Sequence, residues 1–246
     1  MFDLMRYKYL FFFISLLVIL PGLFSLARYG LKLSIDFTGG TVIEKNAGGE
    51  VIRSELVGPV IGRETTQNAF YSVGLASLAI ILYIAYAFRE IPKPYSPWKF
   101  GVAAVIALFH DVLVVVGIFS LLGHFYNVQI DSLFVTAILT VIGFSVHDTI
   151  VVFDRIRENL RKTLPAGRQA PDIFTQVVNE SLVQTLGRSL TTSLTVLFTL
   201  LALILFGGQS IHWFVVALFV GVFSGTYSSI FNAAPLLVLW EEKRMK

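Results

Sequence analysis

The chain has 246 residues, of which 55% are hydrophobic and 14% charged, and its mean hydropathy is +0.75. These values exclude a water-soluble globular enzyme as the default interpretation. The formal net charge of +3 is too small to indicate a nucleic-acid-binding surface. The lack of cysteine excludes disulfides and cysteine metal ligands. The first question is therefore how often the chain crosses a bilayer.

Six segments are apolar enough to cross a membrane. A crossing helix needs about 20 mostly apolar residues, because its backbone polar groups must be satisfied internally. The segments lie near residues 10–26, 70–88, 101–122, 130–153, 189–206 and 211–240. The last two share one stretch without charges between Arg188 and Glu241, which Gly207-Gly208-Gln209-Ser210 divides. We therefore predict an all-α membrane protein with six transmembrane helices.

The distribution of basic residues predicts the orientation. Because the number of crossings is even, both termini lie on one side. Most of the 19 Lys and Arg residues lie at the termini or in the links after the second and fourth helices. Those on the opposite side are Arg28, Lys32, Lys45, Arg53 and Arg63. Since short cytoplasmic loops are rich in Lys and Arg, we predict a multi-pass protein of the cell membrane with both termini in the cytoplasm.

This topology divides the chain into five regions. They are the cytoplasmic N-terminus with the first helix (1–27), a short exported segment (28–68), helices two to four (69–154), a cytoplasmic region (155–187), and helices five and six with the cytoplasmic C-terminus (188–246). Three β-compatible runs, at 33–35, 41–44 and 51–57, predict a hairpin-sized cap in the exported segment. Amphipathic runs at 155–162 and 172–186 predict a pair of cytoplasmic helices at the membrane interface, with a solvated charged linker as the alternative.

Two carboxylates lie inside predicted spans rather than at their ends. Asp111 is in the third helix and Asp148 in the fourth, and each follows a histidine, His110 or His147. An ionisable group near a helix centre costs about 2.5–3.5 kcal/mol on insertion scales, so it usually faces a partner or a water path. Both aspartates are therefore candidate functional residues.

The fourth predicted helix carries a small, polar stripe. Its members recur at spacings of three and four and so share one helix face: Ser132, Thr136, Thr140, Gly143 and His147. We expect this face to point into a helix bundle, and close helix packing alone would also explain it. The sixth helix has a similar ridge from Gly221 to Asn232, which we interpret as packing.

Arg188 begins the hydroxyl-rich start of the fifth helix, which includes Thr192. An arginine at a helix end normally extends to the membrane interface. At the depth of Asp148, however, it could set the proton affinity of that carboxylate, because a nearby cation favours the charged form. A change in the distance between the two side chains would then load and release a proton. We predict a proton-relay group without metal or cofactor: Asp148, Arg188, His147, Asp111, Thr140 and Thr192.

Three sequence blocks carry a resemblance to a known family: Asp36-Phe37-Thr38-Gly39-Gly40, residues 143–159, and residues 179–193. With its six crossings, the chain resembles the SecF family, the smaller membrane subunits of SecDF protein-export complexes, a branch of the RND superfamily. The resemblance implies an RND-type half bundle in which Asp148 carries protons and Arg188 is coupled to it. It also implies SecD, the SecYEG channel with SecA, an exported polypeptide and the lipid bilayer as partners, and protein export rather than an enzyme activity.

One feature departs from the family pattern. Members usually have a periplasmic domain of ferredoxin-like type between the first two helices, and the segment 28–68 is about half as long as such a domain. We therefore assign no substrate contacts to residues 41–63.

Three alternatives remain open from the residues alone. Asp111 and Asp148 could form the dyad of an intramembrane aspartyl protease, although both follow histidine instead of the expected glycine. With His110 and His147 they could form a metal site, although the spacing is not diagnostic. The main alternative function is an RND-type half-transporter for a small molecule or lipid, which the six helices also permit.

Overall fold

A computed structural model describes the chain except for residues 1–2, 46–50, 90, 93–94, 164–170 and 245–246. The described part has six helical segments long and apolar enough to cross a membrane, which confirms the predicted number. They are Met5–Tyr29, Pro59–Ala87, Pro97–Tyr126, Ser132–Thr163, Ile173–Phe206 and Gln209–Lys243.

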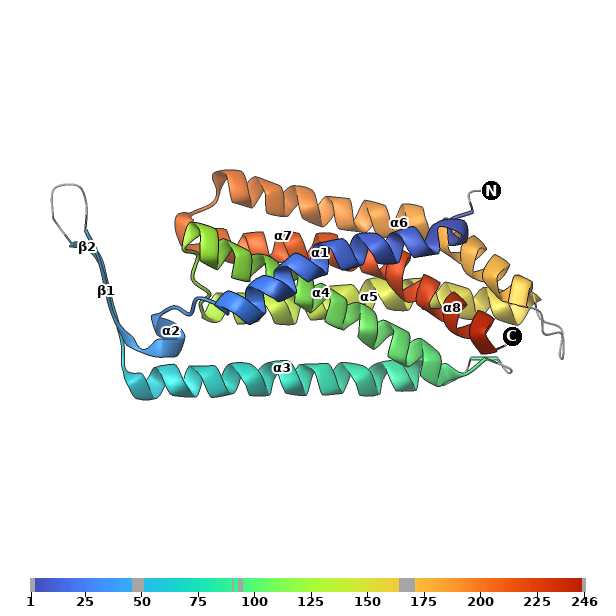
Figure 1. Cartoon of the computed structure of the whole chain (residues 1–246), viewed down its shortest axis with the longest axis horizontal. Coiled ribbons are helices and arrows are strands. Elements are labelled where there is room, and N and C mark those ends of the chain that lie inside the picture. Colours follow the sequence, from blue (N-terminus) through green and yellow to red (C-terminus); the bar gives the residue numbers. More distant parts are fainter. Residues whose placement is uncertain (1–2, 46–50, 90, 93–94, 164–170, 245–246) are drawn as a thin grey trace.

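The helices form one elongated bundle (Figure 1). Within it, α7 contacts α4, α5 and α6, and α1 lies against α4. The long helix α3 runs along one flank and contacts α4 and α5. The two termini lie at the same end of the bundle, opposite the β1–β2 hairpin, as an even number of crossings requires (Figure 1). The helix bounds are α1 Lys8–Tyr29, α3 Pro59–Ala87, α4 Pro97–Tyr126, α5 Ser132–Thr163, α6 Pro171–Phe206, α7 His212–Ser228 and α8 Ala234–Arg244.

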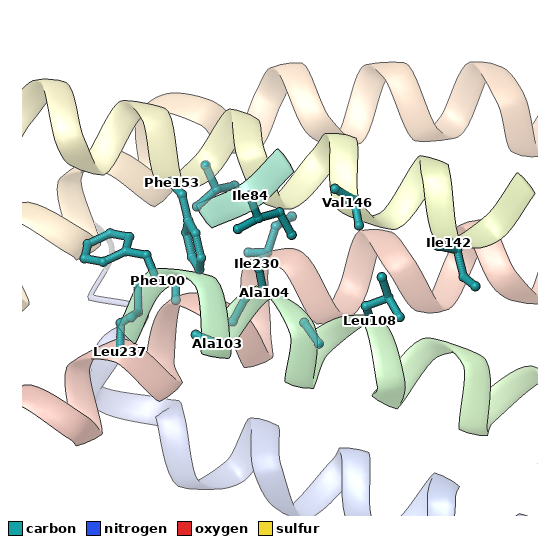
Figure 2. Packing of buried hydrophobic residues seen from close by; sticks show 14 of the residues in the cluster. Ile84, Phe100, Ala103, Ala104, Leu108, Ile142, Val146, Phe153, Ile230 and Leu237 are labelled. Atoms are coloured by element: carbon teal, nitrogen blue, oxygen red, sulfur yellow. The ribbon is translucent and has the colours of Figure 1, made fainter. Parts of the chain in front are cut away.

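The hydrophobic core is densest toward the end of the bundle that carries the termini. Phe153 of α5 packs edge-on against Phe100 of α4, with ring centroids 5.3 Å apart, and against Phe88, 5.6 Å away. Ile84 and Phe88 are fully buried there, so this end of α3 is anchored while most of the helix stays exposed. Figure 2 shows Ile84, Phe100 and Phe153 meeting between the helices.

Two glycines bring α1 and α4 into backbone contact. A Cβ atom added to Gly22 would lie 2.8 Å from the Cα of Gly117, and the converse holds. Nearby, the Ser25 and Ser120 hydroxyls are 2.9 Å apart, and both side chains are buried. Small and hydroxyl residues permit this close approach of transmembrane helices.

The segment between α1 and α3 contains the predicted hairpin. Strands β1 (Gly40–Lys45) and β2 (Val51–Val57) pair antiparallel, whereas residues 33–35 do not form a third strand of that sheet. Instead, Leu33 makes an isolated bridge with Ile130, and Ile35 begins the short helix α2 (Ile35–Thr38). Helix α3 begins at Pro59, inside the region expected to be non-helical, because proline suits the first turn of a helix.

The block from Asp36 to Gly40 ties this segment to two helices. The Asp36 carboxylate accepts a hydrogen bond from the backbone N–H of Ser132, 2.9 Å away, and so caps the start of α5. Gly39 has φ of +69° and lies so close to α3 that an added Cβ would be 2.9 Å from the Cα of Pro59. Position 39 therefore requires glycine, because a side chain would disfavour the positive φ and would clash with the backbone of α3.

The predicted cytoplasmic helix pair differs from the structure. Residues 155–163 continue α5, and residues 171–187 are the first part of α6, so neither run is a separate helix. Both helices can continue because no proline interrupts the described residues 155–163, and the proline in 171–187 is the first residue of α6. The predicted break at Pro165–Gly167 lies outside the described residues. The two extensions are joined by Asn159, which donates to Ser181 Oγ and Gln184 Oε1, both at 2.9 Å.

The sixth crossing is one helical segment, Gln209–Lys243, whose hydrogen-bond pattern changes near its middle. Residues Ser229–Ala233 form a π-helical segment between α7 and α8. Such segments place an extra residue in a helical turn and are frequent at functional sites. Here the segment lies beside the polar cluster described below.

We predict that Gly22→Ala lowers the free energy of unfolding in detergent by about 1–3 kcal/mol, because its methyl group must push two backbones apart. The matched variant is Gly74→Ala, where an added Cβ has no neighbour within 4 Å. It should leave stability unchanged or raise it by less than about 1 kcal/mol. Equal effects of the two variants in denaturant unfolding would contradict the close α1–α4 contact.

Candidate functional site

A buried carboxylate on α4 connects three helices. Asp111 is 0% exposed and accepts hydrogen bonds from three serine hydroxyls. Ser145 of α5 and Ser228 of α7 donate to Oδ2 at 2.5 and 2.6 Å, and Ser224 of α7 donates to Oδ1 at 2.7 Å. His110 Nδ1 lies 3.0 Å from Oδ1. Both oxygens of Asp111 therefore have polar partners, as a buried carboxyl group requires.

A chain of hydroxyls extends from this cluster along the π-helical segment. Ser229 Oγ lies 2.9 Å from Thr149 Oγ1 and 3.3 Å from the carbonyl oxygen of Ser145. Both hydroxyl side chains are buried. Hydroxyl groups accept and donate protons in hydrogen bonds, so polar contacts run from the surroundings of Asp111 to the residue next to Asp148.

Asp148 lies on α5 in a different environment. It is 5% exposed, and its Oδ2 has no hydrogen-bond partner in the described structure. Ser189 Oγ of α6 is likewise buried without a hydrogen-bond partner in the described structure. A buried carboxylate oxygen without a donor is costly in free energy. Binding a proton, a water molecule or a nearby cation would remove this cost.

Arg188 precedes Ser189 and is exposed. It lines a hydrophilic pocket of about 310 Å³ between α5 and α6, together with Asp154, Arg155 and Glu158. Val151, three residues after Asp148, lines the same pocket. No ion pair joins Arg188 to Asp148 in the part of the chain described here, so the two predicted partners are neighbouring but separate in this conformation.

The predicted hydroxyls and His147 lie on the outside of the bundle. Thr140 donates to the carbonyl of Thr136 at 2.8 Å, Thr192 donates to that of Arg188 at 2.9 Å, and all are exposed. The polar stripe of the fourth crossing thus faces outward, not into the six-helix bundle as expected. Helical spacing identifies which residues share a face, but it does not reveal which face another helix covers.

The residues around Asp111 were not singled out from the sequence. Ser224 and Ser228 stand four apart on α7, inside the ridge interpreted as packing, and Ser145 lies in the fourth crossing. Their four-residue spacing was the available signal, but the same spacing is common in ordinary helix packing.

The described residues give no support to the metal or protease alternatives. They contain no cluster of three or more possible His, Asp or Glu ligands. His147 is exposed, whereas His110 contacts Asp111 inside the bundle. Within the described structure, the contacts of Asp111 are with serines and His110, not with Asp148.

The fold and the two buried acids define a multi-pass membrane protein with a polar interior. The family described as "Protein export membrane protein SecD/SecF, C-terminal" matches residues 40–243, and the "SecD/SecF GG Motif" matches residues 24–44. The chain therefore belongs to the SecD/SecF family, which confirms the resemblance seen in the sequence.

Similar proteins include the protein translocase subunits SecF of Thermobaculum terrenum and Anaerolinea thermophila. The first is 44% identical and the alignment covers 99% of this chain and 95% of the relative; the second is 39% identical, with 98% and 94% covered. The crystal structure of SecDF from Thermus thermophilus superposes with a TM-score of 0.82 at 32% identity. It covers 98% of this chain, which spans only 39% of that protein.

The alignment with the Thermobaculum protein extends over 310 positions, more than the 246 residues of this chain. The relative therefore contains residues that have no counterpart here.

We predict that Ser228→Ala lowers the unfolding free energy by about 1–3 kcal/mol, since it removes a hydrogen-bond donor from a buried carboxyl oxygen. Thr199→Ala is the control, because Thr199 is exposed and bonds only to its own helix in the described contacts. It should change stability by less than about 0.5 kcal/mol. Thermal unfolding in one detergent would compare them, and equal stability of both variants would argue against the Asp111 cluster as a structural link.

Proposed function

We propose that this chain is a subunit of the protein-export machinery that promotes translocation across the cytoplasmic membrane by using the proton-motive force. Its family membership and its relatives named protein translocase subunit SecF support the export role. The observation that carries the proton coupling is Asp148. It is a buried acid with an unpartnered oxygen, and it lies one turn from the hydrophilic pocket that holds Arg188.

The proposed cycle depends on the distance between these two side chains. With Arg188 in the pocket, the low-dielectric surroundings favour a protonated Asp148. When α5 and α6 shift so that the guanidinium approaches, the charged carboxylate is favoured and the proton leaves. Each proton that crosses contributes about 2.3 kcal/mol per 100 mV of membrane potential. Repeated events would supply work for a mechanical cycle.

Asp111 has a supporting role in this proposal. Its hydroxyl partners hold α4, α5 and α7 together, and the contacts continue through Ser229 to Thr149 beside Asp148. We infer that the cluster maintains the geometry of α5. A proton moving between Asp111 and Asp148 would also need intervening water, because the path passes through the carbonyl oxygen of Ser145. His147, Thr140 and Thr192 lie on the outer face and would contribute once another helix covers them.

That covering helix is proposed to come from SecD. A relative from Thermus thermophilus is named protein translocase subunit SecDF, and this chain corresponds to 24% of it over the matched region. The exposed hydroxyl stripes of α5 and α6 suit close contact with another helix. Through SecD, we propose that the chain works with SecYEG and SecA on an exported polypeptide. The basic residues near both termini support a cytoplasmic location for these ends.

We predict that Asp148→Asn and Arg188→Met abolish proton-dependent export while the complex still assembles. Neither the amide of asparagine nor the thioether of methionine carries or exchanges a charge at this site. Export of a reporter protein into inverted vesicles, with and without a proton gradient, measures the effect. Asp111→Asn should be milder, because it keeps part of the hydrogen-bond cluster.

The matched control is Glu64→Gln, which neutralises an exposed acid on α3 far from the pocket. It should export as the unchanged chain does, and co-purification with SecD should be unaltered in every variant. If gradient-dependent export survives in both Asp148→Asn and Arg188→Met, the proton assignment is wrong. If SecD does not co-purify with the unchanged chain, the partner assignment is wrong.

A further inference from the structure

An apolar groove lies between α3 and α4, at the end of the bundle that carries the termini. Its volume is about 500 Å³, and its walls include Ile81 and Ala85 from α3 and Val102 and Val105 from α4. Its position follows from the course of the two helices, which meet at this end of the bundle (Figure 1). Helix α3 is otherwise scarcely covered, since only 6% of its most apolar window is buried.

Charged and aromatic residues stand at one end of this groove. Arg89 lines it, and its guanidinium stacks 3.8 Å above the ring of Tyr86 and donates to the Tyr86 carbonyl at 3.1 Å. The guanidinium of Arg157 donates to the carbonyl of Ala87 at 3.4 Å but is ion-paired with Asp154, so Arg89 is the cation that lines the groove. Trp98 also lines the groove and is 71% exposed. Tryptophan is typical of the boundary between lipid headgroups and acyl chains.

We propose that this groove binds one anionic phospholipid of the cytoplasmic leaflet. The apolar walls would hold an acyl chain, and the stacked guanidinium of Arg89 would hold the phosphate. Arginine binds phosphate through several N–H donors in a fixed plane. Basic pockets between helices on the cytoplasmic side are known to suit anionic headgroups. The combination of an apolar wall and a cation at one end matches the two parts of such a lipid.

The occupant is a lipid rather than a second protein, because the apolar walls of the groove and its one basic residue lie at different places along the groove. The residues that line the groove are apolar except for Arg89, which stands with Trp98 at one end of it, as the headgroup and acyl chain of one lipid require. The inference rests on the cytoplasmic placement of the termini but not on proton transfer. Its failure therefore leaves the Asp148 mechanism untouched.

Native mass spectrometry of the full chain, purified together with its co-expressed partner subunits, tests the proposal. The probes are phosphatidylglycerol and phosphatidylcholine with identical acyl chains. We expect phosphatidylglycerol to bind about fivefold more tightly, the effect of one arginine near an anionic headgroup. Arg89→Gln should remove this preference. Arg63→Gln, on the opposite end of the same helix and also exposed, should keep it.

A second variant, Val105→Trp, fills the groove and should weaken both lipids equally, because it occupies the acyl-chain space. Equal binding of the two lipids to the unchanged chain, or a preference that persists in Arg89→Gln, would overturn the proposal. So would tight binding of free glycerol phosphate without acyl chains, which would indicate a simple phosphate site. Lipid binding to the chain alone but not to the complex with its partner subunits would also overturn the proposal, because a protein helix would then fill the groove.

Discussion

The bundle depends on how it accommodates a carboxylate that water cannot reach. Asp111 lies in the middle of α4, and serines from α5 and α7 supply the hydrogen bonds that solvent would otherwise provide. Because a missing donor would leave a buried carboxyl oxygen without a partner, these hydrogen bonds hold the three helices in one arrangement. The glycine contact between α1 and α4 then adds a fourth helix to the same unit.

Asp148 is about as buried as Asp111 but is not fully hydrogen-bonded. One of its oxygens lacks a donor, and the nearest arginine lies in a separate hydrophilic pocket. The contrast separates two roles for intramembrane acids. A fully satisfied acid holds helices together, whereas an unsatisfied one is sensitive to a proton or to an approaching cation. In the proposed mechanism, the unsatisfied acid Asp148 responds to the proton, and the satisfied acid Asp111 keeps the surrounding helices in place.

Hydropathy alone predicted the number of crossings, because the requirement for about 20 apolar residues is strong and local. The β-compatible runs predicted the hairpin, and the position of Asp148 inside a span predicted a buried carboxyl group, which the structure shows. The serine cluster could not be found in this way, since its members lie 34, 113 and 117 positions from Asp111 in the chain. The outward direction of the Thr140 face was also missed. Spacing along one helix contains no information on neighbouring helices, and here the neighbour belongs to a different polypeptide under our proposal.

The Asp36 cap joins the segment before the β1–β2 hairpin directly to the start of α5. Its carboxylate holds the first backbone N–H of α5, and Ser34 and Lys32 pair with Ile130 just before that helix. The residues just before the β1–β2 hairpin are thus hydrogen-bonded to the start of α5, the helix that carries Asp148. In the cycle that we propose, an axial shift of α5 would therefore be transmitted to the base of the hairpin through this hydrogen bond.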